Sequence, residues 1–253
     1  MRYLYGGKYM NDTIKVEKGK TLMVAHQGGT VAERGNTKPA FRDMARRTYF
    51  GAECDVRVTG DKKFVIHHNA VTGGDSDREV DIATSDLATI REVNIFPGDP
   101  NANYPEGEMK IPTFEEYLEI CKSGEKYCII EIKGPYERED IERLIDIVRD
   151  YDYLDKSIFI DFDLEHCKIV RELLPNAKIQ WLIAIGQYND EVLATMDKYD
   201  LDLDINIYEV NQKIVDDAHA HGHLVNLWTC DDAEQAKPLL ALGPDFLTTN
   251  VLE

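Results

Sequence analysis

The chain has 253 residues, of which 47 are acidic and 29 are basic, so its formal net charge is −18. Binding to nucleic acid or to an anionic membrane requires a positive surface, and this charge argues against both kinds of partner. The composition is 43% hydrophobic and 30% charged, which is enough apolar material for a sizeable core. The length suits a single α/β barrel.

Long apolar segments and paired cysteines do not occur in the sequence as given. No stretch approaches the roughly 18 to 20 consecutive apolar residues of a membrane span, and residues 1–20 have no apolar signal-peptide region. Five scattered cysteines form no Cys-x-x-Cys pair. They are Cys54, Cys121, Cys128, Cys167 and Cys230. We therefore predict reduced, buried thiols, no integral membrane segment and a cytoplasmic location.

The first half of the chain alternates aliphatic runs with helical patterns. Strands are expected over residues 21–26, 52–58 and 64–68, and helices after Thr37 and over residues 85–93 and 112–121. Residues 69–110 interrupt this order with a long polar segment that contains Pro97-Gly98-Asp99-Pro100. Loops of this length in compact domains are usually functional or disordered, so we expect an insertion over one mouth of the domain.

The second half is more regular. Strands are expected over residues 127–132, 157–161, 178–184, 203–207, 224–228 and 246–248, with helices over 139–150, 164–174, 190–198, 212–221 and 232–242. Such alternation predicts parallel β-α units, and about eight of them close into a (β/α)8 TIM barrel. An open, doubly wound sheet is the alternative, disfavoured because no Gly-x-Gly-x-x-Gly turn follows the first strand. We predict an accessory arm over residues 1–20 and one barrel domain over residues 21–253.

Charged residues collect at the predicted strand ends, where the reactive groups of such barrels stand. Glu53 and Asp55 are two positions apart and face the same side of a strand, as do Glu131 and Lys133. Three carboxylates supply the hard oxygen ligands that suit Mg²⁺ or Ca²⁺. Lys133 is the local cation that an anionic substrate needs on so acidic a protein.

Three histidines occupy the ends of two further predicted strands: His26, and the adjacent pair His67 and His68. Histidine titrates near neutral pH, as an acid–base pair requires. Taken singly, each of these carboxylates and histidines is explained by a structural role at least as well as by a catalytic one. Together they favour a catalytic site, because uncompensated buried charges cost several kcal/mol each.

Short motifs follow one another in a fixed order between residues 21 and 250. They are VAHQG at 24–28, GNTKPAF at 35–41, GAECDV at 51–56, VIHH at 65–68, IPTFEE at 111–116, IEIK at 130–133 and VNLWT at 225–229. The ordered set resembles the glycerophosphodiester phosphodiesterase family, part of the superfamily of phospholipase C-like TIM-barrel phosphodiesterases. No single motif is specific, but their order is.

The resemblance implies a metal-dependent hydrolase of glycerol and lipid metabolism. One divalent cation, Mg²⁺ or Ca²⁺, would bind to Glu53, Asp55 and Glu131. His26 and His67 would be the catalytic acid–base pair. A glycerophosphodiester would be cleaved to sn-glycerol 3-phosphate and an alcohol, by attack of the neighbouring glycerol hydroxyl and hydrolysis of the resulting cyclic phosphate.

The resemblance also implies the substrate-binding residues. Lys133 would contact the phosphate, and Gln27 stands where the family has an arginine that clamps it. Trp228 either stacks on an alkyl or choline group of the ligand or caps the core.

Two departures from the family pattern bear on the substrate. Where the family has a glutamate before Asn-Thr, this chain has Gly35. This change and the replacement of the family's arginine by Gln27 are linked if that glutamate and that arginine form a pair in other members. Arg34 and Arg57 lie near enough in the sequence to replace the missing cation. His68 stands in place of the family's aspartate.

The sequence leaves two rival functions open. One is a lyase that stops at the cyclic phosphate, which analysis of the phosphorus product would reveal. The other is a barrel that binds phosphodiesters without turnover, in which ligand stabilises the fold and no product forms. The head group, the choice of metal and the oligomeric state are open too.

Overall fold

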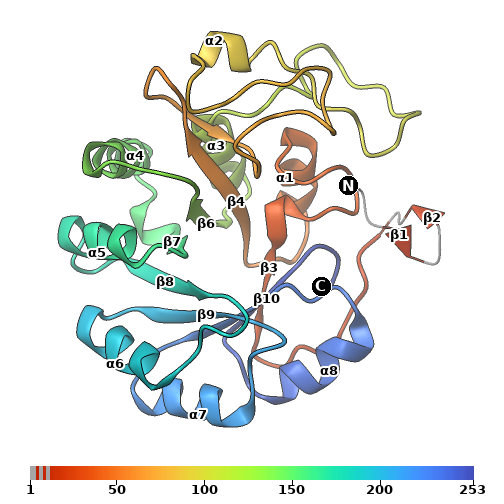
Figure 1. Cartoon of the computed structure of the whole chain (residues 1–253). Coiled ribbons are helices and arrows are strands. Elements are labelled where there is room, and N and C mark those ends of the chain that lie inside the picture. The colour runs from red at the N-terminus through yellow and green to blue at the C-terminus, as the bar shows by residue number, and fades with distance from the viewer. Residues whose placement is uncertain (1–3, 6–7, 10–11) are drawn as a thin grey trace.

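Parallel strands that close on themselves form the centre of the computed structural model, which describes residues 4–5, 8–9 and 12–253. Within these residues the barrel has eight strands. They are β3 (Leu22–Ala25), β4 (Gly51–Val58), β6 (Tyr127–Ile132), β7 (Ser157–Asp161), β8 (Lys178–Ile183), β9 (Asp202–Asn206), β10 (Val225–Trp228) and β11 (Phe246–Thr249). Each pairs in parallel with the next, and β11 pairs with β3 (Figure 1). The predicted closed α/β barrel is confirmed, and the open sheet is excluded.

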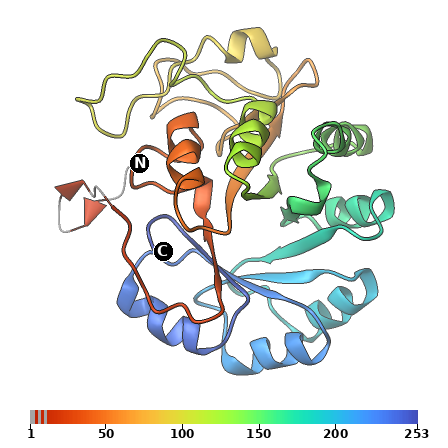
Figure 2. The same cartoon turned by 180° about the vertical axis from the view of Figure 1, so that it is seen from behind.

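Helices surround the strands (Figure 2). They are α1 (Lys38–Ala45), α3 (Phe114–Ser123), α4 (Arg138–Asp150), α5 (Leu164–Leu173), α6 (Asp190–Tyr199), α7 (Gln212–Ala220) and α8 (Ala233–Ala241). Thr37 caps α1, which has a proline in its first turn, and Thr113 forms a capping box with Glu116 at the start of α3. Apolar side chains of strands and helices pack between the two layers as the main core. All five cysteines are buried and free, as predicted.

A short additional strand, β5 (Phe64–Ile66), lies outside the parallel series. It pairs antiparallel with β4 through a tight hairpin in which Lys62 has a φ of 61°. The predicted strand over residues 64–68 is therefore too long by two residues, because the ladder ends at Ile66. His67 and His68 belong to the segment that leaves this strand, so strand alternation does not fix their directions.

The long segment over residues 69–110 has an apolar core of its own. Seven buried side chains form it: Val65, Ile82, Ile90, Val93, Ile95, Met109 and Ile111. Its one helix, α2 (Leu87–Ile90), is shorter than the predicted helix over residues 85–93, and Asp86 caps it. The Nε of Arg34 donates to the carbonyl of Phe96 at 2.9 Å, which ties the segment to the loop after β3. The position of residues 69–110 over one mouth of the barrel stays a prediction.

The N-terminal segment contains a small antiparallel pair, β1 (Leu4–Tyr5) and β2 (Lys8–Tyr9). Backbone hydrogen bonds then join Ile14 to Val251 and Val16 to Glu253. The predicted arm over residues 1–20 includes positions 1–3, 6–7 and 10–11, which lie outside the described residues, and the division into arm and barrel stays a prediction. No helix in the described part of the chain is long and apolar enough to cross a membrane.

Candidate active site

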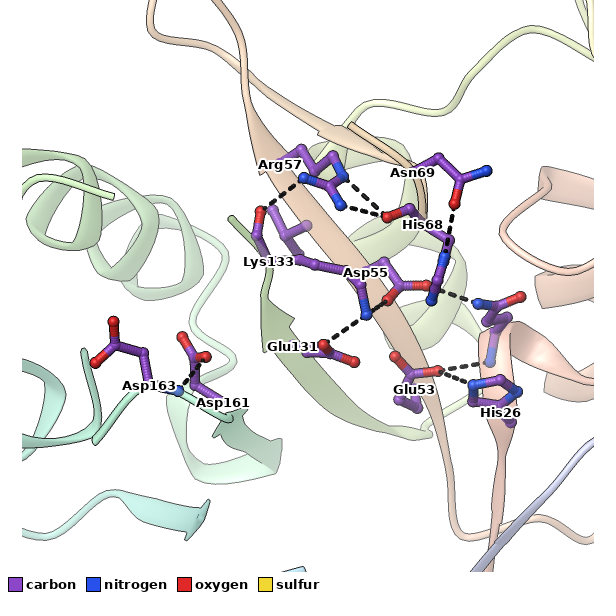
Figure 3. Close-up of polar contacts among 12 residues, drawn as sticks. His26, Glu53, Asp55, Arg57, His68, Asn69, Glu131, Lys133, Asp161 and Asp163 are labelled. Carbon is purple, nitrogen blue, oxygen red and sulfur yellow. Dashed lines mark hydrogen bonds and ion pairs between the residues drawn. The ribbon is translucent and has the colours of Figure 1, made fainter. Parts of the chain in front are cut away.

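Three carboxylates converge inside the barrel, as the strand pattern predicts. Glu53 and Asp55 lie on β4, and Glu131 lies on β6 directly beside Asp55 in the strand register. One oxygen from each residue lies within 4.8 Å of the others, and all three side chains are buried (Figure 3). Burial and the charge of Asp55 raise the pKa of Glu131 to about 7 and hold the pKa of Glu53 well above its usual range.

Lys133 compensates part of this charge. Its Nζ lies 2.8 Å from Oδ1 of Asp55 and 2.7 Å from Oε1 of Glu131. Burial opposes the ionisation of Asp55, yet the neighbouring ammonium group lowers the pKa of this carboxyl below its usual value. One lysine balances only one of three carboxylates, so the ionised cluster keeps an excess of negative charge.

The cluster fits a divalent cation. Its donors are all hard carboxylate oxygens, which suit Mg²⁺ or Ca²⁺. Oε1 of Glu53 is buried and has no hydrogen-bond partner among the described residues. A cation held by Glu53, Asp55 and Glu131 would satisfy this oxygen and offset the excess charge.

His26 stands beside the acidic cluster, on the short turn that follows β3. Its Nε2 lies 3.9 Å from Oε2 of Glu53, and its Nδ1 lies 3.0 Å from Oδ1 of Asn250. Nδ2 of Asn250 donates to Asp231 at 2.8 Å, which fixes the direction of the amide. Its oxygen therefore accepts from Nδ1 of His26, and Nε2 of the neutral ring carries the lone pair. Burial lowers the pKa of His26.

The second predicted histidine differs from the one that the structure brings to the site. His68 lines the same cavity as His26, Glu53 and Glu131. His67, the predicted partner of His26, is not among the cavity-lining residues. Its side chain is buried and its Nε2 has no hydrogen-bond partner in the described structure. Two adjacent histidines are ambiguous by one position in the sequence, and which of them is the partner of His26 stays a prediction.

Arg57 and Arg34 do not replace the missing phosphate-binding arginine. The guanidinium of Arg57 donates to the carbonyls of His68 and Lys133 (Figure 3). It also donates to the carbonyl of His67, so it holds the backbone around the site. Arg34 is bound to the carbonyl of Phe96. Neither residue lines the cavity, which leaves Lys133 as its one lining Lys or Arg within the described residues.

Gln27 contacts the acidic cluster rather than the cavity. Its backbone N–H donates to Oε2 of Glu53 at 2.7 Å, and its amide Nε2 donates to Oδ2 of Asp55 at 2.8 Å. Asn36 donates to the same Asp55 oxygen at 2.6 Å. A Cβ added to Gly35 would lie 2.7 Å from both Cβ and Oε1 of Gln27. The two departures from the family pattern are thus in contact, and Gly35 makes room for the amide.

The cavity has a volume of about 260 Å³ and two unlike walls. The lining residues are His26, Glu53, His68, Glu131, Lys133, Ile160, Phe162, Leu182, Asp204, Trp228, Thr229 and Thr248. On the apolar wall, the ring of Trp228 packs edge-on against Phe162 with centroids 5.5 Å apart. Its Nε1 donates to the carbonyl of Asp204, so its ring, not its N–H, is what Trp228 offers a ligand.

A larger hollow, of about 600 Å³, lies at the opposite end of the barrel. Its lining includes Thr21 and Leu22 at the start of β3 and Phe246 at the start of β11. In barrels of this kind the N-terminal strand ends serve stability, whereas the C-terminal ends carry the chemistry. The smaller cavity with its carboxylates and histidines is therefore the candidate active site.

Asp204 and Asn250 are site residues that the sequence analysis missed. Asp204 lines the cavity from the middle of β9, where it is one of several polar residues that alternate with apolar ones. Asn250 follows β11 and contacts His26 from the far end of the chain. A search for charged residues at strand ends selects neither residue, because Asp204 lies within a strand and Asn250 lies beyond one.

Comparisons with known proteins agree with this geometry. The sequence model of the glycerophosphoryl diester phosphodiesterase family matches residues 26–253. A glycerophosphodiester phosphodiesterase of Caldanaerobacter subterraneus subsp. tengcongensis is 26% identical over 236 residues, which is 91% of this chain and 94% of the relative. A protein of the same description from Bacillus altitudinis is 23% identical, over 91% and 94% of the two chains.

Solved structures show the same fold. A phosphodiesterase from Oleispira antarctica, in complex with the product sn-glycerol-3-phosphate, superposes with a TM-score of 0.82 at 19% identity, over 94% of this chain and 96% of that one. A glycerophosphodiester phosphodiesterase from Parabacteroides distasonis has a TM-score of 0.76 at 22% identity, over 91% and 93%. Motifs, closed barrel, acidic cluster and the match over residues 26–253 agree, and the chain belongs to the glycerophosphoryl diester phosphodiesterase family.

Proposed function

We propose that this protein is a metal-dependent glycerophosphodiester phosphodiesterase that releases sn-glycerol 3-phosphate and an alcohol. The observation that carries the proposal is one cavity lined by Glu53, Glu131, Lys133, His26 and His68, where Asp55 completes the three-carboxylate cluster. A relative of the same fold binds sn-glycerol-3-phosphate as its product. These groups supply a cation site, a phosphate contact and an acid–base pair.

Lys133 positions the phosphate in this proposal. Its ammonium is the one Lys or Arg group on the cavity lining of the described chain, and it is held between Asp55 and Glu131. A divalent cation, when bound, lowers the pKa of the attacking hydroxyl and stabilises the charge that develops on the phosphoryl oxygens.

The two cavity-lining histidines move the protons. Nε2 of His26 is free to accept a proton from the glycerol hydroxyl, because Nδ1 is held by Asn250. His68 gives a proton to the oxygen of the leaving alcohol. In the second half of the reaction, His68 takes a proton from the attacking water, and His26 returns its proton to the departing glycerol oxygen.

Three matched variants distinguish His68 from His67 as the partner of His26. We expect His26→Asn and His68→Asn to lose about 10²- to 10⁴-fold in kcat, whereas His67→Asn keeps most of it. The measurement is release of sn-glycerol 3-phosphate from glycerophosphocholine with saturating Mg²⁺. Loss of activity in His67→Asn, with His68→Asn active and both variants folded, would restore the pair that the sequence predicts.

The nature of the product tests the reaction itself. Glycerophosphocholine and glycerophosphoethanolamine are incubated with Mg²⁺ or Ca²⁺, and again with EDTA, and phosphorus NMR follows the products. We expect metal-dependent glycerol 3-phosphate. Accumulation of the cyclic phosphate would identify a lyase instead. Thermal stabilisation by these compounds without any product would identify a barrel that only binds.

A further inference from the structure

Four buried polar side chains occupy the barrel interior beside the candidate active site: Gln180, Asp204, Asn226 and Thr248. Nδ2 of Asn226, on β10, donates to Oε1 of Gln180, on β8, at 3.1 Å. Strand β9 lies between these two strands, so their side chains can meet only inside the barrel. Thr248 extends the chain of hydrogen bonds by donating to Oδ1 of Asn226 at 3.1 Å.

Asp204 is the incompletely satisfied member of this group. Its side chain is 1% exposed, and its Oδ1 has no hydrogen-bond partner among the described residues. It lines the cavity that also contains Glu131 and Lys133, and it is not part of the three-carboxylate cluster. A buried carboxylate oxygen without a donor is costly, and in native proteins such groups usually have a partner.

The surroundings of Asp204 restrict what that partner can be. Burial raises the pKa of Asp204 well above its usual range, and its carboxyl group is a poor partner for a phosphate, which Lys133 on the lining of the same cavity attracts. The nearby apolar wall gives this oxygen no side-chain donor, because Leu182 has none and the N–H of Trp228 donates to the backbone carbonyl of Asp204. A ligand with a phosphate at one end and hydroxyl groups at the other would satisfy both parts of the cavity at once.

We infer that Asp204 binds the glycerol hydroxyl groups of the substrate and selects for a hydroxylated alcohol on the phosphate. The inference rests on the proposed function, which supplies the phosphodiester. Asp204 accepts hydrogen bonds from the glycerol hydroxyls, while the neighbouring Asn226–Thr248 contact supports the wall beside it. A site built to bond a hydroxyl discriminates strongly against an analogue that lacks it, because its own acceptor is then left unpaired.

Two ligands with the same phosphate test this inference: sn-glycerol 3-phosphate and n-propyl phosphate, which lacks both hydroxyls. Their affinities are measured by calorimetry with saturating Mg²⁺ for the full chain and three variants. For the wild type we expect glycerol 3-phosphate to bind about tenfold to hundredfold more tightly. Asp204→Leu should abolish this preference and leave the affinity for propyl phosphate unchanged.

The other variants keep the test decisive. Asp204→Asn retains one acceptor oxygen and should show an intermediate preference. Asp202→Asn is the matched control on the same strand, outside the cavity lining, and should behave like the wild type. If Asp204→Leu fails to fold, Asp204→Asn decides. An unchanged preference in the folded Asp204 variants would overturn the inference and leave the proposed function intact.

A metal titration without either phosphate compound tests the alternative that Asp204 binds a second cation instead of a hydroxyl group. We expect the same number of Mg²⁺ ions for the wild type and for Asp204→Leu. Loss of one bound ion in the variant would overturn the inference, because Asp204 would then be a second cation ligand. A wild type that binds neither phosphate compound would contradict the proposed function as well.

Discussion

Oδ1 of Asn250 accepts a hydrogen bond from Nδ1 of His26, and the heavy atoms are 3.0 Å apart. The contact joins the turn after the first barrel strand, β3, to the segment after the last strand, β11. Closure of the barrel therefore also sets the tautomer of His26, the proposed base. Asp231 holds Asn250 through both its side-chain and its backbone nitrogen.

Asn250→Ala should therefore impair catalysis without removing a group that binds substrate. We expect kcat to fall about tenfold to hundredfold with little change in KM, because His26 loses its fixed tautomer and orientation. The pH profile of kcat should shift as well. Asn211→Ala, at the N-terminus of α7, is the control and should change neither quantity. A wild-type pH profile in Asn250→Ala would contradict the role assigned to this contact.

Gly35→Ala should weaken metal binding. The added Cβ would approach the side chain of Gln27 to 2.7 Å, and the amide would leave Asp55. Partners that orient a metal ligand are typically worth about 10- to 100-fold in metal affinity. Calorimetric titration with Mg²⁺ measures the effect. Gln27→Ala should act in the same direction, and normal Mg²⁺ affinity in both variants would refute the link.

The side chain of Glu253 should make the stability of the protein depend on pH in acid. Burial opposes its ionisation, but contacts with Lys15, Thr48 and Thr13 lower its pKa to about 2 from 4.5. A lowered folded-state pKa gives stability that is present above pH 4.5 and lost as the pH falls toward 2. Glu253→Gln should cost about 2 kcal/mol at pH 7, after allowance for solvent screening. Urea unfolding at several pH values should show this difference vanish in acid.

Tyr117 should contribute to stability through its hydroxyl. The side chain is fully buried, and its Oη donates to the carbonyl of Ala52 on β4 at 2.7 Å. Tyr117→Phe leaves that carbonyl without this donor, and we expect a loss of about 1–2 kcal/mol in the free energy of unfolding. Tyr151→Phe, whose hydroxyl bonds Glu119 at the surface, should cost less than about 0.5 kcal/mol. Equal effects in urea unfolding would contradict this account.

The sequence predicts the acidic cluster well because strand geometry is regular. Residues two apart on one strand share a face, and parallel neighbours align their ends, so Glu53, Asp55 and Glu131 had to converge. The second histidine follows no such rule, since β5 ends at Ile66 and strand alternation no longer sets the directions of His67 and His68. Asn250 was equally inaccessible, because its contact with His26 spans 224 positions of the chain.

The long insertion shows a different limit of sequence reasoning. Its apolar residues, such as Ile82 and Met109, follow no period of a helix or strand, so residues 69–110 read as a polar excursion. In the structure they form a separate core with Val65 and Ile111, which flank the segment on either side. Irregular backbone hides such a cluster, because only tertiary contacts bring its members together.

The insertion begins and ends at one place. The N–H of Ile66 donates to the carbonyl of Pro112 at 2.9 Å, and Val65 pairs with Thr113 in an antiparallel bridge. A segment whose two ends already touch can be exchanged for a shorter or longer one at little cost in loop-closure entropy. The barrel and its catalytic groups are thus separable, as an engineering unit, from residues 69–110, and grafting another relative's segment in place of these residues, with His67 and His68 retained, is a direct route to altered substrate preference.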